Sequence, residues 1–129
     1  MAMSAAVTLD SLTYYLTAGV VGTRPSAWTV SLHNGPPGIG GTANELAYSG
    51  YTRQSVGFVI DDSKPAAPFA ANNADLTFAA PDTDQTVTHV VVWGGAVPLV
   101  VQALRDPRIL PTGVAAILAT SELIIGGVN

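Results

Sequence analysis

The sequence contains no cysteine and few charged residues. The absence of cysteine excludes disulfides, thiolate metal sites and cysteine nucleophiles, and it leaves the redox compartment open. Only 11% of the 129 residues are charged, whereas typical domains carry about 25%. A surface with so few charges leans towards apolar character, and such a surface is often covered by a partner. The composition therefore favours oligomerisation or docking over a monomer whose surface is built from Ser, Thr, Asn and Gln.

Basic residues are scarce as well, and the formal net charge is −4. The five basic side chains are scattered and form no patch that could neutralise phosphates, so we expect no nucleic-acid partner. No basic residue precedes Arg24, so the N-terminus does not resemble a signal peptide. The longest apolar run, residues 90–101, contains two glycines and a proline and is shorter than the ~20 residues of a membrane helix. We therefore expect no membrane partner.

Residues that could carry chemistry do not occur in catalytic or metal-binding patterns. His33 and His89 each lie in a predicted strand, without another histidine or carboxylate at metal-ligand spacing. The acidic pairs in residues 61–62 and 82–84 fall in predicted turns and lack the remaining ligands of a calcium loop. No Gly-x-Ser-x-Gly motif is present. We predict no cofactor, no metal site and no enzymatic activity.

Residues 7–19 have the pattern of a short amphipathic helix. Thr8 is the expected N-cap, and Gly19 is expected to end the helix. An isolated helix of this length is marginal in water, so its apolar face must pack on the chain's own sheet or on a neighbouring subunit. Three leucines at helical spacing form that face: Leu9, Leu12 and Leu16.

The segment from Trp28 to Phe58 organises the rest of the chain. Residues 28–33 alternate as a half-buried strand, and residues 34–43 form a loop with four glycines and two prolines. A phosphate-binding loop is disfavoured, because no Lys-Ser/Thr follows and the prolines lack the N–H groups of an anion cradle. We expect a surface loop that carries contacts. The candidate contact residues in it are Asn34, Pro36, Pro37 and Ile39.

A Ser-Gly turn between Tyr48 and Tyr51 leads into a second alternating strand, residues 52–60. Both tyrosines flank the turn and are candidate contact residues, for a subunit or for a carbohydrate or peptide. Arg53 is expected to make an ion pair or a backbone cap that locks the turn, with a subunit contact as the alternative. Trp28 and Trp93 lie within apolar alternation and are expected in the core.

The C-terminal half adds further strands. Residues 86–94 are the most β-branched run and the predicted central strand. Residues 99–104 are its expected hairpin partner, with an interruption at Asp106-Pro107. Shorter strands are expected at residues 74–79, 109–110, 114–118 (alternatively a helical turn) and 123–125. We predict a mainly β fold, a compact antiparallel, jelly-roll-like β-sandwich with a short N-terminal helix. One domain spans 1–129, with a helical leader at 1–22 and the sandwich at 26–129.

The order of several short motifs resembles a family of small virion proteins of tailed bacteriophages, which includes tail-fibre-like, minor tail and head-decoration proteins. After Trp93 the chain departs from that pattern, because the usual hairpin is shortened to Gly94-Gly95-Ala96. The motifs that carry the resemblance are Gly22–Pro25, Leu32-His33 with the following Pro-Gly loop, Asn44-Glu45-Leu46, Gly50–Gln54, Asn73–Phe78, Val87-Thr88-His89 with Trp93-Gly94, and Ala103-Leu104.

The resemblance implies a structural, non-enzymatic role in the virion. Low charge, small size and the lack of a long fibrous segment favour a capsid decoration or cement protein on the capsid surface. Its expected partners are the major capsid protein, bound across capsomers, and its own copies, most simply in a homotrimer. The alternative is a tail or tail-fibre component with the loop of residues 34–43 near the host surface. A third hypothesis is a carbohydrate-binding module that uses Tyr48 and Tyr51.

Overall fold

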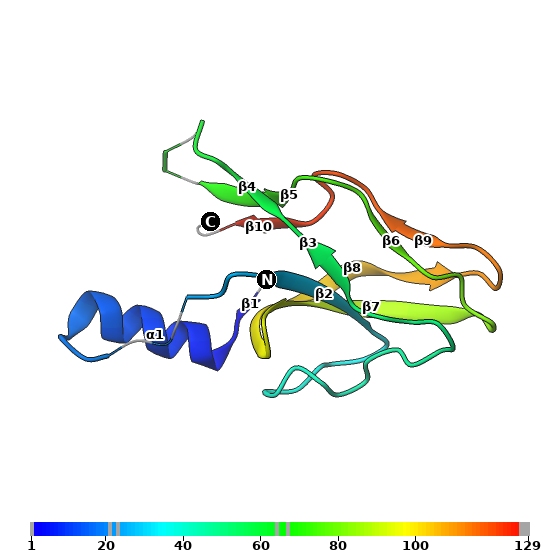
Figure 1. The fold of residues 1–129 in the computed structure, drawn as a ribbon, viewed down its shortest axis with the longest axis horizontal. Coiled ribbons are helices and arrows are strands. Elements are labelled where there is room, and N and C mark those ends of the chain that lie inside the picture. Colours follow the sequence, from blue (N-terminus) through cyan, green and yellow to red (C-terminus); the bar gives the residue numbers. More distant parts are fainter. Residues whose placement is uncertain (1, 21, 23, 64, 67, 127–129) are drawn as a thin grey trace.

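The structure is a computed structural model that describes residues 2–20, 22, 24–63, 65–66 and 68–126. These residues form one helix and ten strands, and every strand pairing is antiparallel (Figure 1). The largest sheet has five strands in the order β1-β8-β7-β2-β3. Their bounds are β1 Ala2–Met3, β2 Trp28–His33, β3 Gln54–Val56, β7 Gln85–Gly94 and β8 Val97–Leu110.

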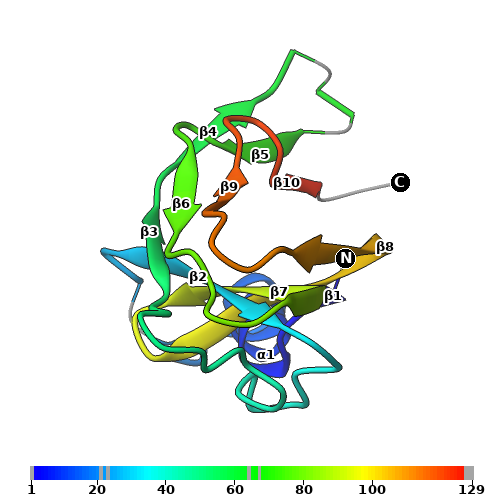
Figure 2. The same ribbon diagram turned by 90° about the vertical axis from the view of Figure 1, so that its right-hand side faces the viewer.

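Two smaller sheets face this main sheet. One has three strands in the order β10-β5-β4, and the other pairs β6 with β9. Figure 2 shows the main sheet at the bottom, the three-stranded sheet at the top and the β6–β9 pair between them. The predicted antiparallel β-sandwich with one N-terminal helix is therefore confirmed. The bounds are β4 Phe58–Asp61, β5 Phe69–Asn72, β6 Leu76–Phe78, β9 Ala116–Leu118 and β10 Ile124–Gly126.

The predicted central strand is confirmed as β7, which lies between β8 and β2. Val92 pairs with Val30, and both side chains enter the core that the smaller sheets close. Val91 and Ser31, the next pair, point to the opposite face and are also fully buried. Burial on both faces explains why this run is almost continuously β-branched instead of alternating with polar residues.

The predicted strand at residues 52–60 is wrong in one respect, because the chain changes sheet at Gly57. β3 pairs with β2 in the main sheet, whereas β4 pairs with β5 in the three-stranded sheet. A Cβ at Gly57 would lie 2.9 Å from the side chain of Asn73, so the corner has no room for a larger residue. Beyond it the expected alternation fails, and Val59 and Ile60 are 56% and 67% exposed.

The hairpin of β7 and β8 is confirmed, and the interruption expected at Asp106-Pro107 is present as an irregularity in the ladder, although the strand does not end there. β8 continues to Leu110, which makes residues 109–110 part of it. Residues 104–107 bulge opposite Thr88, and a bulge tolerates a proline that cannot donate to the ladder. β9 and β10 match the short strands expected at 114–118 and 123–125, and β9 is a strand, not a helical turn. β1 and β5 were not predicted.

Helix α1 spans Ala5–Leu16 and projects from one end of the sandwich (Figure 1). Its N-cap is Ser4, whose Oγ accepts a hydrogen bond from the Val7 N–H, so the predicted N-cap at Thr8 is wrong. The reason is tertiary, because the Ser4 N–H donates to the Leu99 carbonyl and β1 pairs with β8 just before it. The helix ends at Leu16 with Thr17 as C-cap, before the predicted Gly19.

The side chain of Asn72 connects the two smaller sheets. Its side chain is fully buried at the end of β5, and its Nδ2 donates to the carbonyls of Ala74 and Ala119, at 2.9 Å each. Its Oδ1 accepts a hydrogen bond from the Leu123 N–H at 2.9 Å. One amide side chain thus satisfies three backbone groups in the turns before β6, after β9 and before β10.

We expect Asn72→Ala to lower the free energy of unfolding by about 3 kcal/mol, because each buried peptide group that loses its partner costs about 1–3 kcal/mol. Chemical denaturation followed by tryptophan fluorescence measures the change. The matched control is Asn73→Ala at the exposed neighbouring position, which should stay within about 0.5 kcal/mol of the parent protein. Equal stabilities of the two variants would contradict the role given to Asn72.

Candidate functional site

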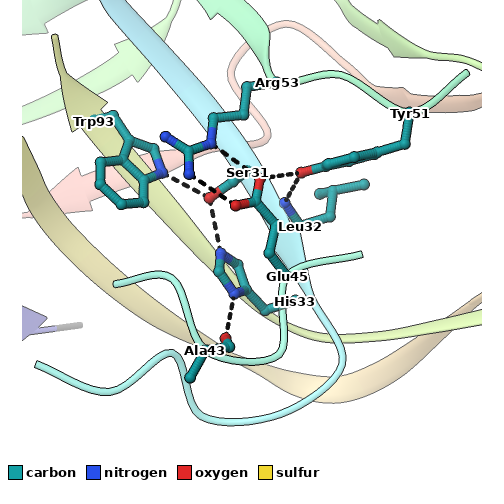
Figure 3. A network of polar contacts seen from close by, with 8 residues as sticks. All are labelled: Ser31, Leu32, His33, Ala43, Glu45, Tyr51, Arg53 and Trp93. Atoms are coloured by element: carbon teal, nitrogen blue, oxygen red, sulfur yellow. Dashed lines mark hydrogen bonds and ion pairs between the residues drawn. The ribbon is translucent and has the colours of Figure 1, made fainter. Parts of the chain in front are cut away.

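A polar network lies on the outer face of the main sheet, under the loop of residues 34–46 (Figure 3). It brings together side chains from β2, from β7 and from the connection between β2 and β3. The network fixes the loop on the sheet. Its side chains belong to Ser31, His33, Glu45, Tyr51, Arg53 and Trp93.

Glu45 is the centre of the network. Its Oε1 accepts from Arg53 Nη2 at 2.7 Å, and its Oε2 accepts from Arg53 Nε at 2.9 Å, which makes the ion pair bidentate. The Tyr51 hydroxyl also donates to Oε2, at 2.9 Å. Burial of Glu45 opposes its ionisation, but the hydrogen bonds from Arg53 and Tyr51 outweigh it and hold its pKa below the ordinary value. The prediction that Arg53 makes an ion pair is confirmed.

Arg53 connects this pair to β7. Its guanidinium lies 3.8 Å from the centroid of the Trp93 ring, a cation–π contact. The Trp93 side chain is almost fully buried, as predicted, and its Nε1–H donates to Ser31 Oγ at 2.7 Å. The indole therefore contacts the ion pair with its face and β2 with its edge.

His33 ties the end of β2 to the loop. Its ring is fully buried, with Nδ1 2.8 Å from the Ala43 carbonyl and Nε2 2.8 Å from Ser31 Oγ. A carbonyl only accepts, so Nδ1 carries the proton and Nε2 accepts from the Ser31 hydroxyl. This neutral tautomer satisfies both nitrogens. Burial also lowers the pKa of His33 below its ordinary value.

The sequence forms this network because β2 extends beyond β3, the neighbouring strand in the main sheet. β3 pairs only with residues 28–30, so the backbone of β2 beyond Val30 needs other partners. The Tyr51 hydroxyl accepts from the Leu32 N–H at 3.0 Å, and the Leu32 carbonyl accepts from the Leu46 N–H at 2.9 Å. Gly50, at φ +85°, makes the turn that returns Tyr51 to β2.

The loop of residues 34–43 is held by its own hydrogen bonds. Asn44 Nδ2 donates to the Pro36 carbonyl, and the Ala43 N–H donates to the Pro37 carbonyl, both at 2.9 Å. Gly41, at φ +75°, lies against Pro98 and Trp93, where a Cβ would come within 2.8 Å of Pro98. The loop therefore packs against the main sheet at Gly41.

Most of the contact residues predicted in this loop are on the surface. Asn34 and Pro36 are exposed, and Ile39 is 90% exposed. Pro37 is buried. The exposed positions remain candidates for contacts, and Pro37 is the exception.

The two tyrosines that flank the turn do not form an open aromatic platform. Tyr48 is 8% exposed and belongs to the core, and its hydroxyl donates to the Ala79 carbonyl at 2.6 Å. Tyr51 is half-buried and stacks on Phe78, while burial raises the pKa of its hydroxyl. The prediction that these rings carry contacts fails for Tyr48, because the turn folds back into the sandwich.

The leucine face of α1 is exposed. Leu9, Leu12 and Leu16 are 65%, 52% and 75% exposed, and Tyr15 beside them is 79% exposed. The sequence left two packing partners open for this leucine face, the chain's own sheet and a neighbouring subunit. Because the three leucines are exposed, the structure excludes the chain's own sheet. The helix contacts the sheet chiefly through its N-cap at Ser4.

An apolar cleft of about 450 Å³ opens between the second half of β8 and the β6–β9 pair. Its floor includes Leu32, Phe78 and Val90, and charged residues 105, 106, 108 and 122 lie at its rim. Gln102 lines it, and its buried Oε1 has no hydrogen-bond partner. Within residues 2–20, 22, 24–63, 65–66 and 68–126, no group of three or more His, Asp or Glu could hold a metal.

No helix in the described part of the chain is long and apolar enough to cross a membrane. The polar side chains of the network are engaged with one another and with the backbone, an arrangement that stabilises one conformation of the loop on the main sheet. Fold and network together define a class of β-sandwich protein that presents a fixed loop on its surface.

Comparison with known proteins agrees with this class. Residues 2–126 match the family described as Podophage GP4 fiber I protein gp80, so the chain belongs to that family of bacteriophage fibre proteins. No curated protein matches the chain significantly. The protein is thus a virion component of a bacteriophage, as the motif resemblance implied. The word fibre in the family description supports the tail or tail-fibre alternative better than capsid decoration.

Several motifs of the resemblance meet in the polar network. Leu32-His33, Asn44-Glu45-Leu46 and the segment from Gly50 to Gln54 contribute most of it, Trp93 adds its indole, and Ser31 joins it from outside the motifs. Sequence reasoning missed Glu45 as the partner of Arg53. The available signal was that two opposite charges flank one turn in a chain with few charges.

We expect Arg53→Lys to lower the free energy of unfolding by about 1–3 kcal/mol, because lysine cannot keep two bonds to Glu45 while stacking on Trp93. Thermal and chemical denaturation measure the loss. Arg108→Lys is the matched control, since its pair with Glu122 is more exposed, with side chains 48% and 41% accessible. That change should cost less than about 1 kcal/mol. Equal losses at the two positions would refute the importance of the stacked, bidentate geometry.

We also expect stability to fall as the pH drops below 6.5. The unfolded chain then protonates His33 at its ordinary pKa of 6.5, while burial keeps the folded histidine neutral to lower pH. The stabilisation is complete above about pH 7.5 and is lost down to the folded pKa, with a slope of at most about 1.4 kcal/mol per pH unit. Denaturation midpoints between about pH 7.5 and 5.5 measure it, and His33→Gln should flatten the profile. Parallel profiles of parent and variant would exclude His33 as the cause.

Proposed function

We propose that this protein is a structural subunit of a bacteriophage tail fibre. The observation that carries the proposal is the match to a fibre-protein family along residues 2–126. The proposed role is mechanical and architectural. The subunit adds contact surface to an assembly that exists only in the virion, and burial of that surface stabilises the assembled state.

Two physical features support this role. The polar network and the hydrogen bonds within the loop of residues 34–43 hold the loop on the main sheet. A rigid surface loses little conformational entropy when it binds, so it binds more tightly than a mobile one of equal area. Exposed apolar side chains on α1 and at Ile39 supply contact area that water solvates poorly.

Capsid decoration is the second candidate. The observation that favours it is the compact sandwich, since no long fibrous segment occurs among the described residues. A compact subunit could repeat over a shell and bind the major capsid protein across capsomers. The family description outweighs this observation, because head-to-tail contacts can also join compact subunits into filaments.

Location and copy number in the virion distinguish the two candidates. We expect gold-labelled antibodies against this protein to mark the tail region of purified particles in electron micrographs. Quantitative mass spectrometry should then give a number of copies per particle far below that of the major capsid protein. Label spread over the whole head, with a ratio to the major capsid protein near one, would overturn the fibre proposal in favour of decoration.

A further inference from the structure

One polar atom in the apolar cleft beside β8 has no hydrogen-bond partner. Gln102 of β8 lines the cleft, and its buried Oε1 accepts no hydrogen bond within the described residues. Every other buried side-chain N or O atom in that part of the chain has a partner. Folded proteins rarely leave a buried acceptor unpaired, because it has lost its bond to water. Gln102 therefore indicates a place for a donor from outside the chain.

The surroundings of Gln102 define the group that can supply this donor. Leu32, Phe78 and Val90 form the apolar floor of the cleft. The cleft volume of about 450 Å³ lies within the roughly 300–1,000 Å³ of ligand sites. The occupant must therefore be mainly apolar and carry one N–H or O–H group. A sugar does not meet this requirement, because its many hydroxyl groups need many polar partners.

The indole of tryptophan meets both requirements. It combines a large apolar body with one polar edge, and its Nε1–H is a donor that brings no acceptor with it. A bond from this N–H to Gln102 Oε1 leaves no polar atom of the ring unpaired. Gln102 as a whole is half-buried, and the terminal torsion of glutamine turns over a broad range, so its amide can face a ring in the cleft.

The two walls of the cleft are joined to each other by hydrogen bonds. Arg108 of β8 donates to Glu122 Oε1 at 2.9 Å and to the Ile117 carbonyl of β9 at 3.3 Å. Glu122 in turn accepts from the Ala119 N–H at 2.7 Å, just after β9. A cleft whose walls are already fixed loses little conformational entropy when a ligand enters it.

The edge of the main sheet at this cleft is open to the backbone of a partner. β1 pairs only with Val100 and Val101, so no strand in the described part of the chain covers the outer edge of β8 beyond them. Unpaired N–H and C=O groups at such an edge bind extended segments. Side chains of an added strand alternate between the two faces of the sheet, so one of them enters the cleft beside Gln102.

The tryptophan must come from a different protein. This chain has two tryptophans, and both pack within its own fold. Trp93 is almost fully buried, and Trp28 packs against the core. A second copy of the chain therefore has no free indole to place in the cleft.

We propose that the cleft binds a tryptophan side chain from an extended segment of a partner protein. The indole N–H donates to Gln102 Oε1, the ring packs on the apolar floor, and the backbone of the segment extends the main sheet beside β8. This inference goes beyond the proposed place in a tail fibre, because the site is the same wherever the protein lies in the virion.

Indole and indene test the bond to Gln102, because the two molecules have nearly the same shape and differ by one N–H group. We expect indole to shift the methyl NMR signals of Ile117, Leu118 and Leu123, which line the cleft. Indole should bind the parent protein roughly two- to tenfold more tightly than indene, the gain expected from one hydrogen bond. Absent shifts, or equal affinities of the two molecules, would overturn the proposal.

Gln102→Leu removes the acceptor and nearly preserves the size of the side chain. The preference for indole over indene should disappear in this variant, while its circular dichroism stays that of the parent, because the change removes an unpaired polar atom. Gln54→Leu is the matched control, because this residue lies on β3, outside the cleft, and the preference should persist. A preference for indole that survives Gln102→Leu would refute the assigned bond.

A capped peptide with a central tryptophan, Val-Thr-Trp-Thr-Val, tests the role of the partner's backbone. We expect it to bind several-fold more tightly than N-acetyltryptophan amide, because its backbone adds to the edge of β8. It should also slow hydrogen exchange in residues 102–104, and replacement of its tryptophan by phenylalanine should weaken binding. Equal affinities of the peptide and the single amino-acid amide would mean that the cleft takes a free indole, which would overturn the proposed protein partner.

Discussion

The structure depends on the ion pair between Glu45 and Arg53. β2 extends beyond β3, and the segment around Glu45 and the hydroxyl of Tyr51 supply partners for the rest of its backbone. Glu45 accepts from that hydroxyl, and Arg53 bonds to Glu45 while its guanidinium lies over the face of Trp93. The pair thus connects the loop, the turn and the central strand, which are distant in sequence, and it fixes the position of the loop on the main sheet.

The position of this ion pair explains how a chain with few charged residues fixes the path of its loop. A charge taken out of water must be compensated, and here the carboxylate receives two bonds from Arg53 and one from Tyr51. The pair of Arg108 and Glu122 has the same chemistry at a more exposed position, where water screens it. Electrostatic stabilisation in this protein is therefore concentrated where it sets the path of the chain. The remaining surface is left largely uncharged and suited to contact.

Local sequence patterns predicted the elements that are determined by one strong local signal. The β-branched run around Val91 identified the central strand, and the leucine spacing identified the helix and its face. The corner at Gly57 was missed, and the continuation of β8 beyond the interruption at residues 106–107 was not predicted, because both depend on a neighbour across the fold. The helix start moved to Ser4 for the same reason, since β8 anchors that residue. In the candidate site, Arg53 was predicted to form an ion pair, but its partner required the geometry of the turn.

The contrast between the satisfied polar network and the exposed leucines of α1 supports the proposed role in the virion. Inside, the polar groups of the network find partners within the chain, so the fold holds its loop without help. Outside, α1 exposes leucines that nothing in the described chain covers. In the proposed fibre, such a subunit would gain stability from assembly, because its exposed apolar side chains leave water only when a partner covers them. Low net charge density then becomes an advantage, since the subunits of a fibre must approach one another closely and repeatedly without mutual repulsion.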